Sequence, residues 1–312
     1  MKKTINIACG SSDLYAPMCG IMLTSLFENN RDCHVEVYIL TSGFGRKNEY
    51  LMNQLVEHGH YDGCVHIIKV DDTRLENCPL LYWSIEGYYS MLLSEILPTN
   101  VDKVLWLECD ILVNGSILPL FETDINDVAI AGNDDICLYS KYSDDDFYKW
   151  LGYPKKYGHF NAGVMLFNLT YFREHHITES LFKYLEDNYN RIKFAAEEVL
   201  NVVLRDQKET FPNKYNVVDL ALLKEVFDET KKEIFLSERP VIVHYTVKPW
   251  SWYWPDYPFK AQWEAARKKS LWSSWESTKP LKLRLHHKLV MSIKKLLRRK
   301  TRYYVDDWKV WA

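Results

Sequence analysis

Two carboxylates interrupt an apolar stretch near the middle of the chain. Residues 103–107 (KVLWL) are typical of a buried strand, and Glu108-Cys109-Asp110 follow them directly. In an extended chain, side chains two positions apart project to the same side, so Glu108 and Asp110 can share one cation. Such oxygen ligands suit Mg²⁺ or Mn²⁺, which also bind pyrophosphate oxygens. The pattern predicts a metal centre at a strand end; the alternative is a solvated acidic pair in a turn.

The N-terminal third alternates between strand and helix patterns. Strand patterns cover 4–9, 34–42 and 64–70, and helix patterns lie between them, the first ending near Glu28. This βαβα order with short connections predicts a parallel sheet covered by helices on both faces, with ligands beyond the carboxyl ends of the strands. The first strand end, from Ala8 to Tyr15, is therefore a predicted nucleotide site.

The remainder of the chain also consists of strand and helix patterns. We expect one apolar strand through 101–115, and a late strand over 239–246 that precedes an aromatic loop. Helices are expected over 87–98 (ending at Pro98), 178–192 and 197–207. The first signal of a domain boundary is Pro280. We therefore predict one large domain over 1–278 and a basic amphipathic C-terminal tail over 279–312.

Composition narrows the class of protein. With 312 residues, 47% hydrophobic and 26% charged, the chain can fill the core of one large α/β domain. The seven cysteines are scattered and form no Cys-x-x-Cys pair, a pattern typical of reduced thiols in a cytosolic protein. We expect the chain to be neither secreted nor membrane-spanning, since no apolar run reaches roughly 18 residues. Aromatic residues make up 14%, and they can stack on sugars or fill a core.

The net charge of −3 conceals an asymmetry between body and tail. Residues 279–302 contain ten Lys and Arg and no Asp or Glu, which leaves 29 Lys and Arg against 42 Asp and Glu elsewhere. In the tail, Leu285, Leu289 and Ile293 fall close to one helical face. Each basic residue near an anionic leaflet contributes about 1 kcal/mol, so the tail is predicted to attach to the inner membrane surface. The alternative is a terminal helix packed on its own domain, and nucleic acid is not expected as a partner of an acidic body.

Taken in order, several segments resemble glycosyltransferase family 8, which includes bacterial lipopolysaccharide hexosyltransferases and glycogenin. The segments are SSDLYAP, GYYSMLLSEILP, VDKVLWLECDILV, FNAGVMLFNL, EEVLN and HYTVKPW, and the resemblance runs from residue 4 to 275. It implies a Rossmann-like fold of the GT-A type. It also implies retaining transfer of galactose or glucose from a UDP-sugar, with Mn²⁺ or Mg²⁺, to a lipopolysaccharide or other surface-glycan acceptor. The basic tail, and not the resemblance, predicts that the enzyme meets this acceptor on the cytoplasmic face of the inner membrane.

The resemblance also implies a set of metal ligands. The family binds its metal through an Asp-x-Asp motif and a late histidine, which match Glu108, Asp110 and His244. Glutamate in the first position keeps the charge and adds a methylene. Without the family, His244 at a strand end would be interpreted as a packed or solvated residue.

Other matched positions imply contacts to the donor. The asparagine that contacts the donor sugar matches Asn161, which Ala162 follows, and the lysine that contacts the diphosphate matches Lys248. Tyr15 matches a tyrosine that stacks on the base, and Ala8 lies on the strand that leads into the site. By themselves, Asn161 would be a turn residue and Lys248 an exposed cation.

Several positions depart from the family pattern. The first loop reads Ser12-Asp13-Leu14-Tyr15, where the family has Asp-Asp-Asn-Tyr, so a carboxylate and an amide are lost. Ser90 replaces a family arginine, and the late segment from His244 to Lys248 is two residues shorter. These changes leave open a degenerate member that binds sugar nucleotide or glycan without turnover. A self-glucosylating protein like glycogenin is a further alternative.

One departure bears on mechanism. The family has glutamine where this chain has Glu197. Retention can arise by front-face attack or by double displacement through a carboxylate nucleophile. Glu197 is therefore a candidate catalytic residue together with Asn161, and the alternative is that it lies on a helix surface.

Overall fold

The structure is a computed structural model that describes residues 2–71, 73–76, 78–80, 84–135, 144–219, 238–246 and 257–276. The predicted tail at 279–312 and Lys248 in the aromatic segment lie outside these ranges. Of the helices that are described, none combines the length and the apolar character needed to cross a bilayer.

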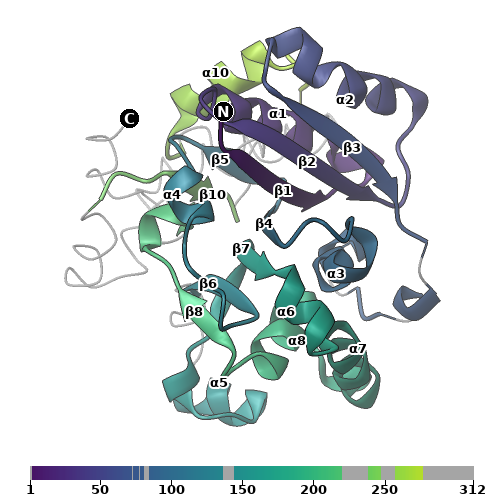
Figure 1. Cartoon of the computed structure of the whole chain (residues 1–312), viewed down its shortest axis with the longest axis vertical. Helices are drawn as coiled ribbons and strands as arrows, with labels where there is room; N and C mark the ends of the chain where they lie inside the picture. Colours follow the sequence, from purple (N-terminus) through teal and green to yellow (C-terminus); the bar gives the residue numbers. More distant parts are fainter. Residues whose placement is uncertain are drawn as a thin grey trace, which may run out of the picture.

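Among the described residues, seven strands form one mixed sheet in the order β3-β2-β1-β4-β7-β6-β8 (Figure 1). The first four are parallel, and β7 runs antiparallel to both β4 and β6. The parallel pairing predicted for the N-terminal strands is therefore confirmed, and the antiparallel strand β7 belongs to the later part of the chain, for which no strand direction was predicted. The strands are β1 (Thr4–Gly10), β2 (His34–Thr41), β3 (Gly63–Lys69), β4 (Lys103–Leu107), β6 (Ile130–Asp134), β7 (Phe160–Asn168) and β8 (Lys208–Thr210).

The described chain also forms a three-stranded sheet, in the order β5-β10-β9. Its strands are β5 (Ile111–Val113), β9 (Val217–Val218) and β10 (Ile242–His244). The acidic segment 108–110 thus connects β4 of the large sheet to β5 of the small one, and the prediction of one strand through 101–115 is wrong. The carboxylates interrupt the apolar run because the chain changes sheets there.

One face of the large sheet is covered by α1 (Ala16–Glu28) and α2 (Arg46–Gly59), and α10 (Lys260–Lys269) packs against α1. Alternate strand residues such as Ile5, Ile7 and Val37 point to this face, as period-two alternation requires. The residues of α1 from Ala16 to Phe27 are all buried. Both helices lie where the sequence predicts them.

The opposite face is covered by helices from the second half of the chain together with the segment before β4. They are η3 (Ile85–Leu92), α3 (Leu93–Ile96), α6 (Leu169–Glu174), α7 (Ile177–Asn188) and α8 (Ala195–Val203). The predicted helix over 87–98 is a 3₁₀ helix along η3 and an α-helix only along α3. It ends before Pro98, as expected.

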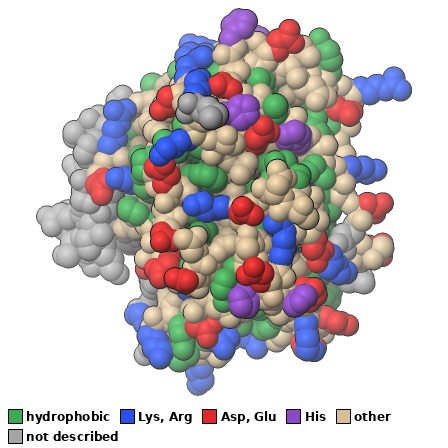
Figure 2. All heavy atoms as spheres, viewed as in Figure 1, with side chains coloured by type: hydrophobic (Ala, Val, Ile, Leu, Met, Phe, Trp, Pro, Cys, Tyr) green, Lys and Arg blue, Asp and Glu red, His purple; other side chains and the backbone are tan. Residues whose placement is uncertain are grey.

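Short helices complete the described elements. They are α4 (Leu118–Phe121), α5 (Asp144–Leu151), η1 (Asp13–Tyr15), η2 (Thr73–Leu75), η5 (Lys155–Tyr157), η6 (Tyr189–Arg191) and η7 (Asn213–Tyr215). On the face shown in Figure 2, charged side chains of both signs are interspersed.

Trp272, just beyond α10, closes the core over α1 and α2. It is 4% exposed, and its indole N–H donates to the Asn48 Oδ1 atom at 3.1 Å. A Cβ atom placed on Gly20 would lie 2.0 Å from the Trp272 ring. The close approach of helix and indole therefore requires glycine at position 20.

We predict that Gly20→Ala lowers the free energy of unfolding by about 1–3 kcal/mol, because the added methyl must displace the Trp272 ring. Urea unfolding followed by tryptophan fluorescence measures this. Gly87→Ala is the matched control, since no other heavy atom of the described chain lies within 4 Å of a Cβ there. Equal stability of the two variants would contradict the packing described.

Candidate active site

The structure brings together the three predicted metal ligands. The His244 Nε2 atom lies 3.2 Å from Glu108 Oε2 and 3.4 Å from Asp110 Oδ1. Their ligand atoms all lie within 4.8 Å of one another. Glu108 and Asp110 occupy the turn after β4, and His244 is the last residue of β10. The convergence therefore depends on the meeting of the two sheets and not on an extended acidic strand.

Backbone hydrogen bonds fix the acidic turn at both ends. The Glu108 N–H donates to the Gly163 carbonyl at 3.0 Å, and the Tyr245 N–H donates to the Asp110 carbonyl at 2.7 Å. The first bond ties the turn to β7, and the second ties it to the end of β10. Both carboxylates are thereby held by rigid strands, as a preorganised site requires.

Two amide side chains orient the His244 ring. Its Nδ1 atom lies 3.1 Å from Asn161 Oδ1 and 3.2 Å from Asn216 Oδ1. Asn161 Oδ1 is an acceptor, because it also receives the Gly163 N–H at 3.0 Å. An Nδ1 proton donated to these oxygens leaves Nε2 facing the carboxylates, which is the tautomer that a metal ligand needs.

No sequence pattern predicts a role for Asn216. It follows the short helix η7, and its side chain donates from Nδ2 to Asn161 Oδ1 at 3.0 Å. An asparagine after a turn is common, so only the fold reveals its position beside His244.

Electrostatics in this group favours a cation. Burial alone would lower the pKa of His244, but hydrogen bonds and charges from Asp110 and Glu108 raise it well above 6.5. The histidine is 3% exposed. In the protein alone, the protonated imidazole balances two neighbouring carboxylates.

The donor set fits a divalent cation. Two carboxylate oxygens and one imidazole nitrogen are acceptable ligands for Mn²⁺, and the oxygens also suit Mg²⁺. Gly163 makes room for the ring, because a Cβ there would lie 2.2 Å from His244 Cε1. The side chain of Glu108 is 35% exposed, so the group is reachable from solvent.

Glu197 on α8 lies beside this group. Its Oε2 atom accepts the Ala162 N–H at 2.9 Å and lies 3.4 Å from Asn161 Nδ2. Only 15% of its side chain is exposed, so Glu197 is not a solvated residue of the helix surface. Burial raises its pKa to about 7, and the charge of Glu108 acts in the same direction, whereas hydrogen bonds from Ala162 and with Asp135 oppose it.

His159 and Asp135 lie next to Glu197, and neither was predicted as a site residue. His159 Nε2 lies 3.3 Å from Glu197 Oε1, and ligand atoms of all three residues lie within 4.8 Å of one another. Burial lowers the pKa of His159 to about 3. A usable signal existed, since His159 lies two residues before Asn161 and therefore projects to the same side of an extended chain.

The first loop lies next to the acidic turn. The Cys109 thiol, between the two acidic residues, donates to the Gly10 carbonyl at 3.2 Å. Beyond Gly10, Asp13 is exposed and its Oδ1 accepts from the Gly45 N–H and Asn48 Nδ2, each at 2.8 Å. The Asp13 carboxylate thus anchors the loop to the start of α2.

Other predicted donor contacts remain predictions. Ser12 and Tyr15 are partly exposed, and the Tyr15 N–H donates to the Ser12 carbonyl at 3.1 Å. Ala8 is fully buried between its register partners Tyr38 and Trp106, so its side chain is covered in this structure. Lys248 lies outside the described residues.

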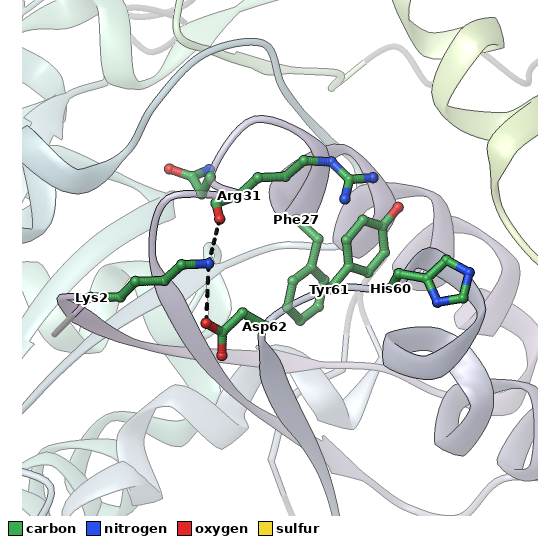
Figure 3. A pocket seen from close by; sticks show the side chains of 7 residues that line it. Lys2, Phe27, Arg31, His60, Tyr61 and Asp62 are labelled. Atoms are coloured by element: carbon green, nitrogen blue, oxygen red, sulfur yellow. Dashed lines mark hydrogen bonds and ion pairs between the residues drawn. The ribbon is translucent and has the colours of Figure 1, made fainter.

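A separate hollow of about 250 Å³ lies near the amino ends of β1, β2 and β3, away from the acidic turn (Figure 3). Its charges are already paired, since Lys2 Nζ lies 3.1 Å from Asp62 Oδ2 and donates to the Arg31 carbonyl at 2.8 Å. The lining residues are Lys2, Phe27, Asn30, Arg31, His60, Tyr61 and Asp62. This hollow adjoins the start of β1 and not the strand ends that carry the acidic turn.

The protein has a Rossmann-like mixed sheet of the GT-A type that presents two carboxylates and a histidine beyond its strand ends. The sequence model of glycosyl transferase family 8 matches residues 6–253, so the chain belongs to this family. The chain is a glycosyltransferase.

Individual relatives agree with this assignment. The chain is 26% identical to a lipopolysaccharide 1,2-glucosyltransferase of Escherichia coli over 80% of its own length and 74% of that protein. It is 24% identical to a lipopolysaccharide 1,3-galactosyltransferase of Salmonella typhimurium, over 97% and 90%. The galactosyltransferase LgtC, solved in complex with donor and acceptor sugar analogs, superimposes with a TM-score of 0.71 at 21% identity, over 90% of this chain and 99% of LgtC. An active-site mutant of LgtC gives a TM-score of 0.74 at 20% identity, with the same coverage. The structural matches confirm the fold.

We predict that His159 makes the protein sensitive to acid. Its native pKa of about 3 lies below the unfolded value of about 6.5, so between these pH values the unfolded state binds the extra proton. The free energy of unfolding therefore falls as pH falls through this window, by up to about 1.4 kcal/mol per pH unit from this group.

Urea midpoints at pH 7, 6 and 5 measure this slope. Relative to the wild type, His159→Gln should become more stable as the pH falls from 7 to 5, because it lacks the contribution of the buried imidazole, whereas the difference between exposed His58→Gln and the wild type should stay constant. An unchanged slope in His159→Gln would mean that the buried imidazole does not cause the acid sensitivity.

Proposed function

We propose that the chain is a metal-dependent, retaining glycosyltransferase that transfers galactose or glucose from a UDP-sugar to a lipopolysaccharide or another surface glycan. The observation that carries the proposal is the convergence of Glu108, Asp110 and His244 at the strand ends of a family 8 chain. Relatives named as lipopolysaccharide glucosyl- and galactosyltransferases support the choice of hexose and acceptor.

The role of the metal follows from the chemistry of the leaving group. A divalent cation bound by these residues would stabilise the negative charge that develops on the departing nucleoside diphosphate. Asp110 and Glu108 would supply the charge that retains such a cation, and the amides of Asn161 and Asn216 fix the orientation of His244.

Asn161 connects the metal ligands to Glu197. Its Oδ1 atom is occupied by Gly163, His244 and Asn216, whereas its Nδ2 atom reaches Glu197 and carries a second proton. That second proton is available for a hydroxyl of the donor sugar. The proposal for retention is front-face attack, with Glu197 placing Asn161 and Ala162 through hydrogen bonds.

Glu197 as a covalent nucleophile is the second candidate mechanism, favoured by the nearness of its carboxylate to Asn161. This mechanism requires an ionised Glu197 carboxylate, and with a pKa of about 7 only part of the Glu197 population is ionised at neutral pH. The two mechanisms make opposite predictions for an amide at this position.

We expect a metal-dependent turnover that fails without Asp110. Purified protein should release UDP from UDP-galactose or UDP-glucose with Mn²⁺ and not after chelation. Asp110→Asn should lower the rate about 100-fold or more, because the cation contributes several kcal/mol of charge stabilisation. Asp187→Asn, in an exposed pair with Lys183, is the matched control. Nucleotide binding without turnover in any donor screen would favour the degenerate alternative.

We expect Glu197→Gln to retain activity within about tenfold, since an amide oxygen can still accept the Ala162 N–H. Its activity should also lose any dependence on a group that titrates near pH 7. Mass spectrometry of the wild type with donor should show no hexose attached to the chain. A loss of activity of about 10⁴-fold in Glu197→Gln, together with a hexosyl adduct on Glu197 of the wild type, would instead establish Glu197 as the nucleophile.

We further propose that residues 279–312 attach the enzyme to the cytoplasmic face of the inner membrane, where a lipid-linked acceptor is present. The ten basic residues of 279–302 support this. Pelleting with anionic liposomes should retain the full chain and lose a chain ending at residue 278. Equal pelleting of both chains would show that residues 279–312 do not attach the enzyme to the membrane.

A further inference from the structure

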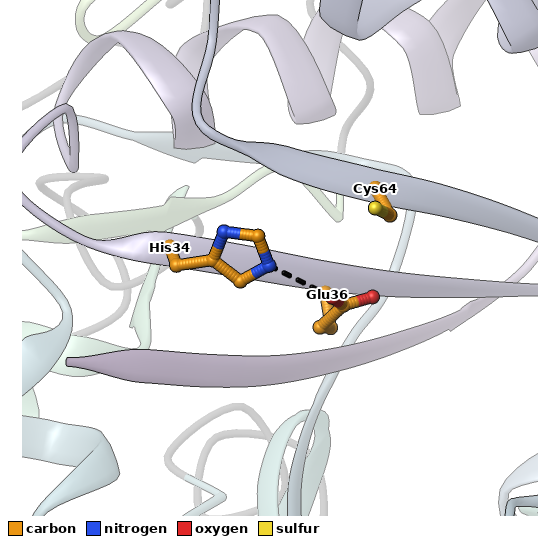
Figure 4. A group of neighbouring side chains, drawn as sticks. All are labelled: His34, Glu36 and Cys64. Carbon is orange, nitrogen blue, oxygen red and sulfur yellow. Dashed lines mark hydrogen bonds and ion pairs between the residues drawn. The ribbon is translucent and has the colours of Figure 1, made fainter. Parts of the chain in front are cut away.

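A second group of metal-ligating side chains lies on β2 and β3, near the edge of the sheet that faces away from the acidic turn. His34 and Glu36 share one face of β2, and Cys64 and His66 share the same face of β3. The parallel register places Glu36 directly beside Cys64. His34, Glu36 and Cys64 project together from the two strands (Figure 4).

The face that carries these residues is partly uncovered. Parallel strands in α/β proteins are usually apolar on both faces, because helices cover both. On this face Tyr38 and Leu40 of β2 are buried in an apolar cluster, whereas the side chains of His34 and Glu36 are partly exposed. Figure 2 shows histidine and acidic side chains gathered over this part of the molecule. A set of polar side chains at these positions needs a reason other than core packing.

The donor atoms of these residues lie close together. His34 Nε2 lies 2.8 Å from Glu36 Oε1, and His66 Nε2 lies 2.7 Å from Glu36 Oε2. One ligand atom from each of His34, Glu36 and Cys64 lies within 4.8 Å of the other two. Imidazole nitrogen, thiolate sulfur and carboxylate oxygen are the ligands of Zn²⁺ in proteins, and thiolate selects against Mg²⁺ and Mn²⁺.

We propose that His34, Glu36 and Cys64 bind a Zn²⁺ ion, with His66 as the nearest further donor. On binding, the Cys64 thiol and the Nε2–H group of His34 each release a proton to solvent, so that His34 binds through the lone pair on Nε2 while its Nδ1–H still donates to Asp62. The inference is independent of the transferase site, because it involves other residues at another edge of the sheet.

The surroundings of the ligands support the assignment. The other nitrogen of His34, Nδ1, lies 2.6 Å from Asp62 Oδ1. A carboxylate in this position orients a ligand histidine and increases its basicity in zinc sites. Asp62 is itself held by Lys2 at 3.1 Å. The His66 ring stacks on Tyr38, with ring centroids 5.0 Å apart and an interplanar angle of 17°.

Accessibility also fits an ion that enters from solvent. The side chains of His34 and Glu36 are 33% and 22% exposed. Among the described cysteines, Cys64 is exposed, whereas the others are buried. In the described part of the chain, β3 is the outermost strand of its sheet. An ion at this point would clamp β3 to β2 and protect the sheet edge.

The test uses the unaltered full chain first. Metal-free protein is treated with a thiol-alkylating reagent, with Zn²⁺, with Mg²⁺ or with no metal added, and modification of Cys64 is followed by peptide mass spectrometry. We expect Zn²⁺ to slow alkylation of Cys64 at least about tenfold, since a bound thiolate is a poor nucleophile, and Mg²⁺ to have no effect. Equal alkylation rates with and without Zn²⁺ would overturn the proposal.

Metal content and spectroscopy separate this site from the acidic turn. The wild type and Asp110→Asn should both show a thiolate-to-cobalt charge-transfer band with Co²⁺, whereas Cys64→Ser and His34→Gln should lack it. Both of these variants should bind one Zn²⁺ fewer than the wild type by elemental analysis. His175→Gln, at an exposed histidine elsewhere, is the matched control. A band that persists in Cys64→Ser, or the same zinc content in all variants, would overturn the assignment.

Discussion

The site depends on one close approach, between the backbone of Gly163 and the imidazole of His244. A side chain at position 163 would occupy the space of the ring, so the small sheet can reach the large one only across a glycine. The Gly163 carbonyl then holds the Glu108 N–H, and its own N–H holds Asn161 Oδ1. One residue without a side chain thus positions a carboxylate, an amide and a histidine from three separate segments.

This arrangement couples two regions that differ in charge. On one side, two carboxylates and a protonated histidine form a group ready to exchange a proton for a cation. On the other, Glu197 and His159 are both shifted toward their neutral forms by burial. Asn161 lies between them and contacts both. The polarity of the site therefore changes sharply over the length of one amide side chain.

Much of the frame was predictable because it follows from local periodicity. The strands β1, β2 and β3 and the helices α1 and α2 have clear alternating or helical patterns, and the resemblance to family 8 groups Glu108, Asp110 and His244, which the structure brings together. The 3₁₀ winding of η3 and the change of sheets at 108–110 could not be predicted, since both depend on tertiary packing. The positions of Asn216 beside His244 and of Asp135 beside Glu197 are set by long-range contacts that no local pattern encodes.

The position of β7 has a consequence for how such an enzyme can diversify. This strand is paired on both sides, with β4 and with β6, and its register with β6 shifts between Ala131 and Asn133. A shift of Asn161 by one residue would turn its amide away from His244 and Glu197. Loops tolerate insertions and deletions better than a strand that is paired on both sides. Such an enzyme can therefore accommodate new acceptors through changes in loop length, while β7 keeps the register that positions Asn161.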